Sequence, residues 1–196
     1  MKPMGLLTLQ GDYEKHRRSF HALGVETRNV RRPEELDGIS GLVIPGGEST
    51  TLTRLVDRVG LRHPLKEFAA NHPVMGTCAG LIMMASRLVD EDQEDFGVDP
   101  LGIMDVEVLR NGYGRQIDSF TAPVAIDILD GSVEPFPAVY IRAPRIVKVG
   151  EGVDVVIRHG DEPVAVRAGH HLAFTFHPEL TDDLRLHQAF LAMASS

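Results

Sequence analysis

The first half of the chain alternates between short apolar runs and amphipathic segments, and this alternation constrains the fold more than any other feature. The apolar runs have the length of buried strands, and the segments between them have the charge distribution of helices. We expect strands at 5–10, 25–30, 41–44 and 73–77, and helices at 13–23, 50–59, 64–70 and 79–88. Gly24 predicts the end of the first helix. Strands that alternate with helices predict βαβ units and a parallel sheet.

The second half contains short runs rich in β-branched residues, separated by turn residues. These predict strands at 106–109, 124–129, 139–141, 146–149, 153–157, 164–167 and 172–176, followed by a helix at 180–193. We interpret the strands as a more antiparallel part of the same sheet together with a small added sheet. The acidic segment 90–100 predicts a surface loop. The expected fold class is therefore α/β, a three-layer, doubly wound, mainly parallel sheet, in a single domain over residues 1–196.

Composition excludes several classes of protein. The 196 residues are 43% hydrophobic, which is enough for one substantial core. A formal net charge of -8 argues against a nucleic-acid partner. The single cysteine excludes an internal disulfide framework. No apolar run approaches the roughly 20 residues of a membrane span, and the N-terminus lacks the apolar core of a secretory signal. We therefore expect a cytoplasmic protein without a membrane partner.

A cysteine bracketed by glycines follows the strand expected at 73–77 and opens the next helix. The segment Gly76-Thr77-Cys78-Ala79-Gly80 has the Gly-x-nucleophile-x-Gly pattern of a nucleophile elbow, with cysteine in place of serine. Such a turn places Cys78 over the positive end of the helix, which favours a thiolate, and the N–H of Ala79 could hold an oxyanion. The alternative is a small, buried and inert cysteine. The strand-to-helix context favours the nucleophile.

A thiol nucleophile needs a base, and the base needs a group that orients it. His177 ends a strand-like run and is followed by Pro178 and Glu179. Because residues two apart on an extended segment point to the same face, Glu179 can reach the far ring nitrogen of His177. A late strand of a doubly wound sheet would bring both residues to the edge at which Cys78 emerges. The alternative is a surface turn that begins the last helix.

The other histidines are weaker candidates for the base. His170 and His171 lie at an expected turn and lack a carboxylate at the right spacing. The remaining histidines have the positions of solvated helix residues. With one cysteine in the chain, the histidines do not make the pattern of a structural zinc site.

A glycine turn ends the strand expected at 41–44. Gly46 and Gly47 can adopt conformations closed to other residues, and their N–H groups could complete an oxyanion hole opposite Cys78. Ser49 or Thr50 is expected to cap the following helix. The alternative is a turn and a cap without a catalytic part. No Gly-Lys-Ser/Thr follows, which excludes a phosphate loop.

These three motifs together resemble those of class I, triad-type glutamine amidotransferases. More narrowly, the chain is similar to the glutaminase subunits of pyridoxal 5'-phosphate synthases. The segments that carry this resemblance run in order over nearly the whole chain: Leu9-Gln10-Gly11, Pro45-Gly46-Gly47-Glu48-Ser49-Thr50-Thr51, Gly76-Thr77-Cys78-Ala79-Gly80-Leu81, Arg110-Asn111, Gly114-Arg115-Gln116, Asp118-Ser119-Phe120, Ile141-Arg142-Ala143-Pro144 and Phe176-His177-Pro178-Glu179-Leu180-Thr181. The resemblance implies a flavodoxin-like fold.

The resemblance also implies roles for individual residues. Cys78, His177 and Glu179 would form the catalytic triad, and the backbone of Gly47 and Ala79 would form the oxyanion hole. The residues that would contact L-glutamine are Gly47, Glu48, Ser49, Arg110, Ile141 and Arg142. A zwitterionic amino acid needs a cation for its carboxylate and an acceptor for its ammonium group, so both charge types are expected. For Arg110 and Arg142 the alternative is surface solvation.

The resemblance further implies a partner, a pyridoxal 5'-phosphate synthase subunit with a (β/α)₈ barrel, which receives ammonia for vitamin B6 synthesis. We expect the Cys78 thiolate to attack the glutamine side-chain amide and His177 to protonate the departing ammonia, with no metal or organic cofactor in this subunit. Two alternatives remain open. One is a glutaminase that feeds another pathway. The other is a redox-sensing or binding protein with a cysteine elbow, which would need no oriented base.

Overall fold

The computed structural model describes residues 2–89, 97–112, 119–126 and 134–195, and its largest sheet has seven strands. In chain order they are β1 (Met4–Leu7), β2 (Thr27–Val30), β3 (Leu42–Ile44), β4 (Val74–Thr77), β10 (Asp154–His159), β11 (Glu162–Ala168) and β12 (His171–Phe174). Their order in the sheet is β10-β11-β12-β4-β3-β1-β2. The strands from β12 to β2 pair in parallel, whereas β10 and β11 pair antiparallel. The expected mainly parallel α/β sheet with antiparallel additions is confirmed.

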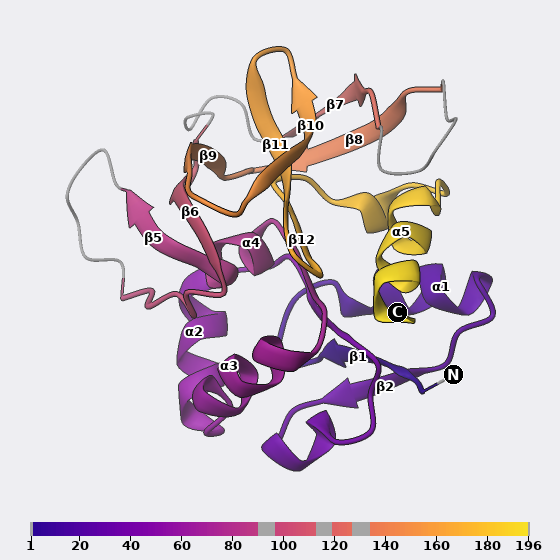
Figure 1. Cartoon of the computed structure of the whole chain (residues 1–196), viewed down its shortest axis with the longest axis vertical. Coiled ribbons are helices and arrows are strands. Elements are labelled where there is room, and N and C mark those ends of the chain that lie inside the picture. Colours follow the sequence, from indigo (N-terminus) through magenta and orange to yellow (C-terminus); the bar gives the residue numbers. More distant parts are fainter. Residues whose placement is uncertain (1, 90–96, 113–118, 127–133, 196) are drawn as a thin grey trace.

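Helices cover both faces of this sheet (Figure 1). Their bounds are α1 (Tyr13–Ala22), α2 (Ser49–Arg58), α3 (Arg62–Asn71), α4 (Ala79–Met84) and α5 (Arg185–Ala194), with short 3-10 turns η1 (Pro33–Leu36) and η2 (Pro178–Leu180). α1 and α5 lie together on one face, and α2, α3 and α4 lie on the other. None of the helices in the described ranges has both the length and the hydropathy that crossing a membrane requires.

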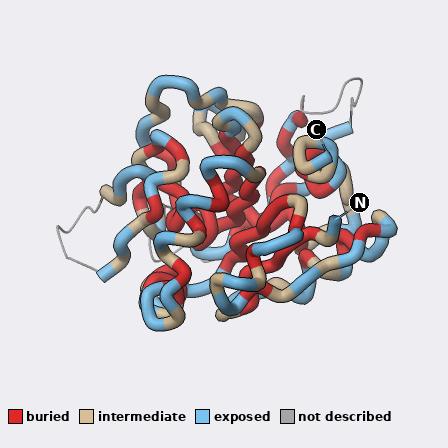
Figure 2. Tube along the Cα trace, turned by 60° about the horizontal axis from the view of Figure 1, so that its bottom comes forward, coloured by how far each residue is buried: buried red, intermediate tan, exposed pale blue. Residues whose placement is uncertain are grey.

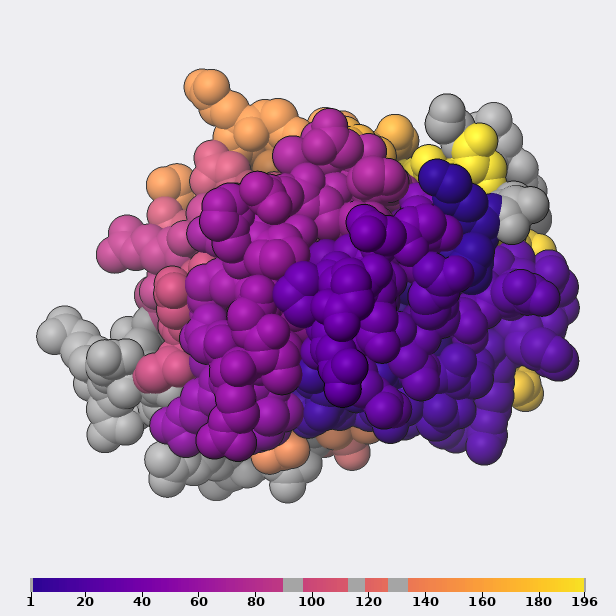
Figure 3. All heavy atoms as spheres, turned by 90° about the horizontal axis from the view of Figure 1, so that it is seen from below, coloured from indigo at the N-terminus to yellow at the C-terminus, as the bar shows by residue number. Residues whose placement is uncertain are grey.

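The core consists of two apolar layers, one on each face of the sheet. Successive strand residues alternate between them: Leu42 and Ile44 pack in the layer beneath α2 and α3, whereas Val43 packs in the layer beneath α1 and α5. The buried segments run through the middle of the molecule, and exposed segments surround them (Figure 2). Seen from below, the surface is formed mainly by the N-terminal half of the chain (Figure 3).

Two small sheets extend this core. One has the order β5-β6-β9, from β5 (Ala85–Val89), β6 (Met104–Leu109) and β9 (Arg145–Val149). The other is an antiparallel pair, β7 (Ser119–Val124) and β8 (Phe136–Ile141). The sequence predicted one added sheet. The structure has two because β6 and β7 pair with different partners.

Several expected element boundaries are wrong. The helix expected at 79–88 ends at Met84, because Ala85 begins the pairing of β5 with β6; a short, fully apolar run does not distinguish helix from strand. The strand expected at 124–129 instead ends at Val124, and residues 127–129 lie outside the described residues. The last helix begins at Arg185, because η2 precedes it. Most of the acidic segment 90–100 also lies outside the described residues. Gly24 ends α1 with φ +73°, as predicted.

Close backbone packing explains the glycines of the cysteine elbow. A Cβ atom on Gly80 would overlap the carbonyl oxygen of Ile44, and one on Gly76 would lie 2.7 Å from the carbonyl carbon of Gly80. α4 therefore packs directly against the ends of β3 and β4, which only glycine permits.

We predict that Gly80→Ala destabilises the protein. In an unobstructed helix interior, replacing glycine with alanine stabilises by about 0.5–1 kcal/mol. Here the added methyl group meets a backbone oxygen, and such overpacking costs about 1–3 kcal/mol. Urea unfolding monitored by circular dichroism measures the change. A midpoint equal to or above that of the wild type would contradict the packing argument.

Candidate active site

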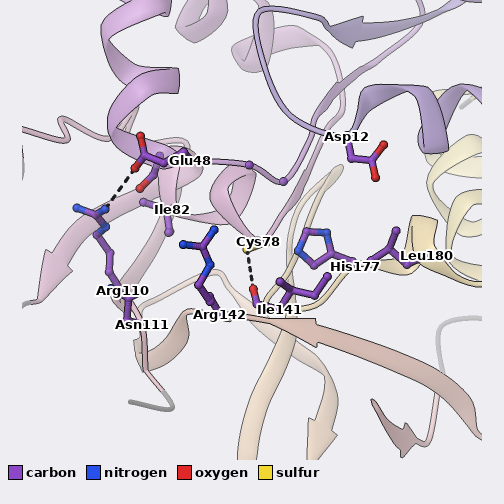
Figure 4. Close-up of a pocket in the computed structure, with 13 residues that line it drawn as sticks. Asp12, Glu48, Cys78, Ile82, Arg110, Asn111, Ile141, Arg142, His177 and Leu180 are labelled. Carbon is purple, nitrogen blue, oxygen red and sulfur yellow. Dashed lines mark hydrogen bonds and ion pairs between the residues drawn. The ribbon is translucent and has the colours of Figure 1, made fainter. Parts of the chain in front are cut away.

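A cavity of about 320 Å³ opens where the parallel strands end (Figure 4). It lies beyond the carboxyl ends of β3 and β4 and beside the segment that leaves β12, which is the usual place for a site in an open α/β sheet. Its lining contains nine of the residues that the sequence singled out: Gly46, Gly47, Glu48, Ser49, Cys78, Arg110, Ile141, Arg142 and His177. Four further residues line the cavity. Asn111 and Leu180 belong to segments that carry the resemblance but had no expected role, and Asp12 and Ile82 were not indicated by the sequence.

Cys78 occupies a strained turn between β4 and α4. Its backbone has φ +50° and ψ -103°, in a region that non-glycine residues seldom adopt. Its N–H donates to the carbonyl oxygen of Phe174, and its Sγ lies 3.8 Å from the carbonyl oxygen of Ile141. Among the described residues, the other non-glycine residues with positive φ are Asn111 and Arg142, and both line the same cavity. Backbone strain is therefore concentrated at this site, as is common at functional sites.

His177 and Glu179 form a buried pair beside Cys78. His177 Nδ1 lies 2.7 Å from Glu179 Oε1, so the predicted contact is present, although Glu179 lies in the 3-10 turn η2 and not on an extended segment. A Cβ atom on Gly46 would overlap the His177 ring and would lie 3.4 Å from Cys78 Cβ, so the turn, the imidazole and the thiol converge. The rival histidine His171 lies at the opposite end of the strands, where its Nδ1 accepts a hydrogen bond from Val74 N.

The environment of the pair favours a charged imidazole. Burial opposes the charge, but hydrogen bonds with Cys78 and Glu179 raise the pKa of His177 from 6.5 to about 10. Burial also opposes ionisation of Glu179, yet His16 and the hydrogen bond from His177 hold the pKa of that carboxyl below its ordinary value. An ionised Glu179 with a protonated His177 is the arrangement that orients and stabilises an imidazolium.

The glycine turn is held from two sides. The N–H of Gly46 donates to Thr77 Oγ1 at 3.0 Å, and the carbonyl oxygen of Gly46 accepts from the N–H of Asp12 at 3.2 Å. Gly47 packs so closely against the Gln10 side chain that a Cβ atom there would overlap it. The orientation of the Gly46–Gly47 peptide in this structure therefore depends on the start of α1.

Charged groups line the far side of the cavity. The carboxylate of Glu48 accepts from the N–H groups of Thr50 and Thr51, so Glu48 caps α2; the expectation of a cap at Ser49 or Thr50 is wrong. Despite partial burial, these hydrogen bonds lower the pKa of Glu48 to about 2. Arg110 Nη2 lies 3.8 Å from Glu48 Oε1. The site therefore presents both charge types that a zwitterion requires. The expected motif residues 114–116 and 118 lie outside the described residues.

Two histidines that the sequence interpreted as solvated are buried. His16 on α1 and His187 on α5 have no exposed surface. His16 lies next to Glu179 and Thr77, and His187 lies next to His16. The sequence did contain a signal for His16, because it is four residues before the buried Phe20 and so shares its helix face.

Known proteins are similar to this chain in sequence and in fold. Residues 6–196 match the model described as the SNO glutamine amidotransferase family. A Geobacillus kaustophilus protein named "Pyridoxal 5'-phosphate synthase subunit PdxT" is 51% identical over 97% of this chain and 93% of its own length. A Deinococcus radiodurans protein of the same name is 47% identical over 97% and 96%. A solved structure titled "Crystal structure of glutamine amidotransferase" is 40% identical, with a TM-score of 0.89 over 98% of this chain and 99% of that one.

We predict that His177 remains protonated at pH 8. Its pKa in the folded protein lies above 6.5, so its contribution to stability is fully present below pH 6.5 and is lost as the pH rises towards about 10. NMR titration of ¹⁵N-labelled histidine measures this directly. In Cys78→Ala the pKa of His177 should fall, because one hydrogen-bonding partner is removed. A midpoint near 6.5 in the wild type would contradict the ion-pair description.

Proposed function

Because the chain belongs to the SNO glutamine amidotransferase family, we propose that it hydrolyses L-glutamine to L-glutamate and ammonia, with Cys78, His177 and Glu179 as its catalytic triad. The observation that carries this proposal is the buried hydrogen bond between His177 and Glu179 beside a strained cysteine. A cysteine that only senses oxidants needs no oriented base, so this pair favours hydrolysis over the redox-sensing alternative.

The proposed reaction proceeds through a thioester. The Cys78 thiolate attacks the side-chain amide carbon of glutamine, and the resulting oxyanion is held by the N–H groups of Gly47 and Ala79. His177 gives its proton to the amide nitrogen, the C–N bond breaks, and ammonia leaves. His177, now neutral, takes a proton from water, whose oxygen attacks the thioester. Breaking of the C–S bond releases glutamate and restores the thiolate. His177 is then protonated again, as it was before the reaction.

The change in charge at Cys78 suits both half-reactions. While the thiolate is present, its attraction helps to keep His177 protonated and ready to act as an acid. Once the sulfur is acylated, that attraction is lost, and the imidazole more readily becomes a base. Glu179 stays ionised throughout and fixes the ring through Nδ1, so that Nε2 is the nitrogen that exchanges the proton.

The charged lining explains how L-glutamine would be selected. We propose that Arg110 and Arg142 bind its α-carboxylate and that Glu48 accepts its ammonium group. Glu48 is ionised at neutral pH, as this role needs. The remaining proposed contacts come from Gly47, Ser49 and Ile141, which line the same cavity. The Ile141 carbonyl oxygen lies 3.8 Å from Cys78 Sγ, which supports a contact of this segment with the reacting amide.

The names of the relatives indicate where the ammonia would be used. A subunit of pyridoxal 5'-phosphate synthase acts with another subunit, and we propose that this chain supplies ammonia to a (β/α)₈-barrel synthase subunit in vitamin B6 synthesis. Both proteins would work in the cytoplasm. Direct transfer avoids loss of ammonia as ammonium in neutral water. The chemistry proposed for this subunit uses only its own residues, without a metal or organic cofactor.

We predict that Cys78→Ala lowers glutaminase turnover by at least about 10³-fold, because it removes the nucleophile of a unit whose members act together. An enzyme-coupled glutamate assay measures turnover, and circular dichroism checks the fold. An electrophilic glutamine analogue should add once to the wild type and not to Cys78→Ala, since Cys78 is the only cysteine. Normal hydrolysis by purified Cys78→Ala would refute the proposed triad.

We further predict that the free subunit is poorly active and that the barrel subunit activates it. The hydrogen bond between Gly46 and Asp12 holds one orientation of the Gly46–Gly47 peptide, and a glycine pair can rotate to another at little steric cost. Gaining one oxyanion donor is worth about 10²–10³ in rate. Turnover should therefore rise as the cognate barrel subunit is titrated in. A value that stays flat to saturation would contradict this prediction.

A further inference from the structure

Behind the cavity, four polar side chains meet in the core between α1, α5, β4 and η2. Thr77, His16 and His187 have no exposed surface, and Glu179 is 4% exposed. Of these four, none lines the cavity around Cys78. Buried polar groups are costly unless they are hydrogen-bonded, and the proposed reaction does not itself require two histidines at this place. The two buried histidines therefore need an explanation beyond the reaction itself.

His16 is the centre of this cluster. Its Nδ1 lies 3.0 Å from His187 Nε2, and its Nε2 lies 3.3 Å from Thr77 Oγ1 and 3.4 Å from Glu179 Oε2. Glu179 Oε2 is buried and has no aligned donor among the described residues. One ring nitrogen of His16 thus lies beside the free oxygen of the carboxylate and beside the hydroxyl that holds Gly46.

Electrostatics selects the tautomer of His16. Burial lowers the pKa of His16 below its ordinary value, so the ring is neutral at neutral pH and can approach Glu179 as a hydrogen-bond donor. If Nε2 were unprotonated, its lone pair would face the ionised Glu179 carboxylate and repel it. With the proton on Nε2, His16 can donate to Glu179 Oε2 or Thr77 Oγ1, and Nδ1 accepts from the Nε2–H of His187.

His187 is suited to fix this tautomer. Burial also lowers the pKa of His187, to about 3, so it too is neutral. Its Nδ1 is buried without a partner among the described residues. Leaving an acceptor unpaired is less unusual than leaving an N–H unpaired, so the proton of His187 belongs on Nε2, where it points to His16.

We propose that His16 is a positioning residue, whose Nε2–H restrains Glu179 Oε2 and Thr77 Oγ1 and so aligns the triad and the Gly46–Gly47 turn together, with His187 fixing its tautomer. α1 holds Gly46 both through Asp12 N–H and, by way of Thr77, through His16. The inference rests on the proposed function, since it assigns His16 to the same triad.

The charged and titratable groups that face His16 come from two elements and the segment before α1. They are Glu179 and His177 around η2, His187 on α5, and Asp12 before α1. Glu179 and Asp12 favour protonation of His16, whereas burial and His177 oppose it. Removing His16 takes a donor from Glu179 and leaves the other groups in place, so the carboxylate should bind protons more tightly.

The first test compares His16→Phe, which fills the space without a donor, with His16→Gln, which keeps an N–H donor. Glutaminase activity is measured in the complex with the barrel subunit. We expect His16→Phe to lower kcat about 10- to 100-fold, with little change in KM. This is the size of effect seen in metalloproteins when a residue that orients a functional histidine is removed. The acid limb of its kcat/KM profile should move to higher pH. His16→Gln should recover part of kcat.

Ser19→Ala is the matched control, because Ser19 is buried on the same helix and donates only to the Lys15 carbonyl oxygen. The proposal would be overturned if His16→Phe had the same kcat, KM and pH profile as the wild type and as Ser19→Ala. It would also be overturned if the kcat of His16→Gln were as low as that of His16→Phe while circular dichroism showed that both variants are folded. A wild-type complex that releases no ammonia from glutamine would instead refute the proposed function.

A second measurement does not depend on activity or on the folding of variants. Long-range ¹H–¹⁵N correlation spectra of the histidine-labelled wild type report the tautomer of each ring. We expect His16 to carry its proton on Nε2 and to stay neutral from pH 6 to pH 8. A proton on Nδ1, or an imidazolium in this range, would overturn the proposal even if glutamine is not the substrate.

Discussion

The site depends on the parallel pairing of β4 with β3 on one side and β12 on the other. This pairing aligns the carboxyl ends of three strands that are far apart in the chain. Gly46 follows β3, Cys78 follows β4, and His177 follows the segment that leaves β12. The contact of α4 with the end of β3, which Gly80 permits, then turns the chain sharply enough to direct Cys78 into the cavity.

The second requirement is to keep a carboxylate charged inside the protein. Glu179 is almost fully buried, and burial alone would favour its neutral form. His177 compensates on one oxygen, and His16 lies beside the other. Because both contacts are short-ranged and directional, they also fix the orientation of the carboxylate. The electrostatic requirement and the geometric requirement of catalysis are thus met by the same side chains.

Much of the site could be predicted from the sequence because its signals are local. The glycines around Cys78 and the two-residue spacing of His177 and Glu179 each specify a geometry within a few residues. Element boundaries were harder to predict where the hydrophobic periodicity was ambiguous. The apolar run after Gly80 fits a helix or a strand equally well, and only its pairing with β6 makes part of it a strand.

The sequence by itself determined the α/β class, the strand-to-helix turn at Cys78 and the His177–Glu179 pair, because periodicity and glycine placement act over short range. Only the tertiary structure decided that His16 and His187 are buried, that Glu48 caps α2, and that Asp12 holds the Gly46 carbonyl. These features depend on which helix faces pack together and on which backbone groups are left to be satisfied. Residues distant in the chain make those contacts, and the local pattern around each of them carries no record of its partner.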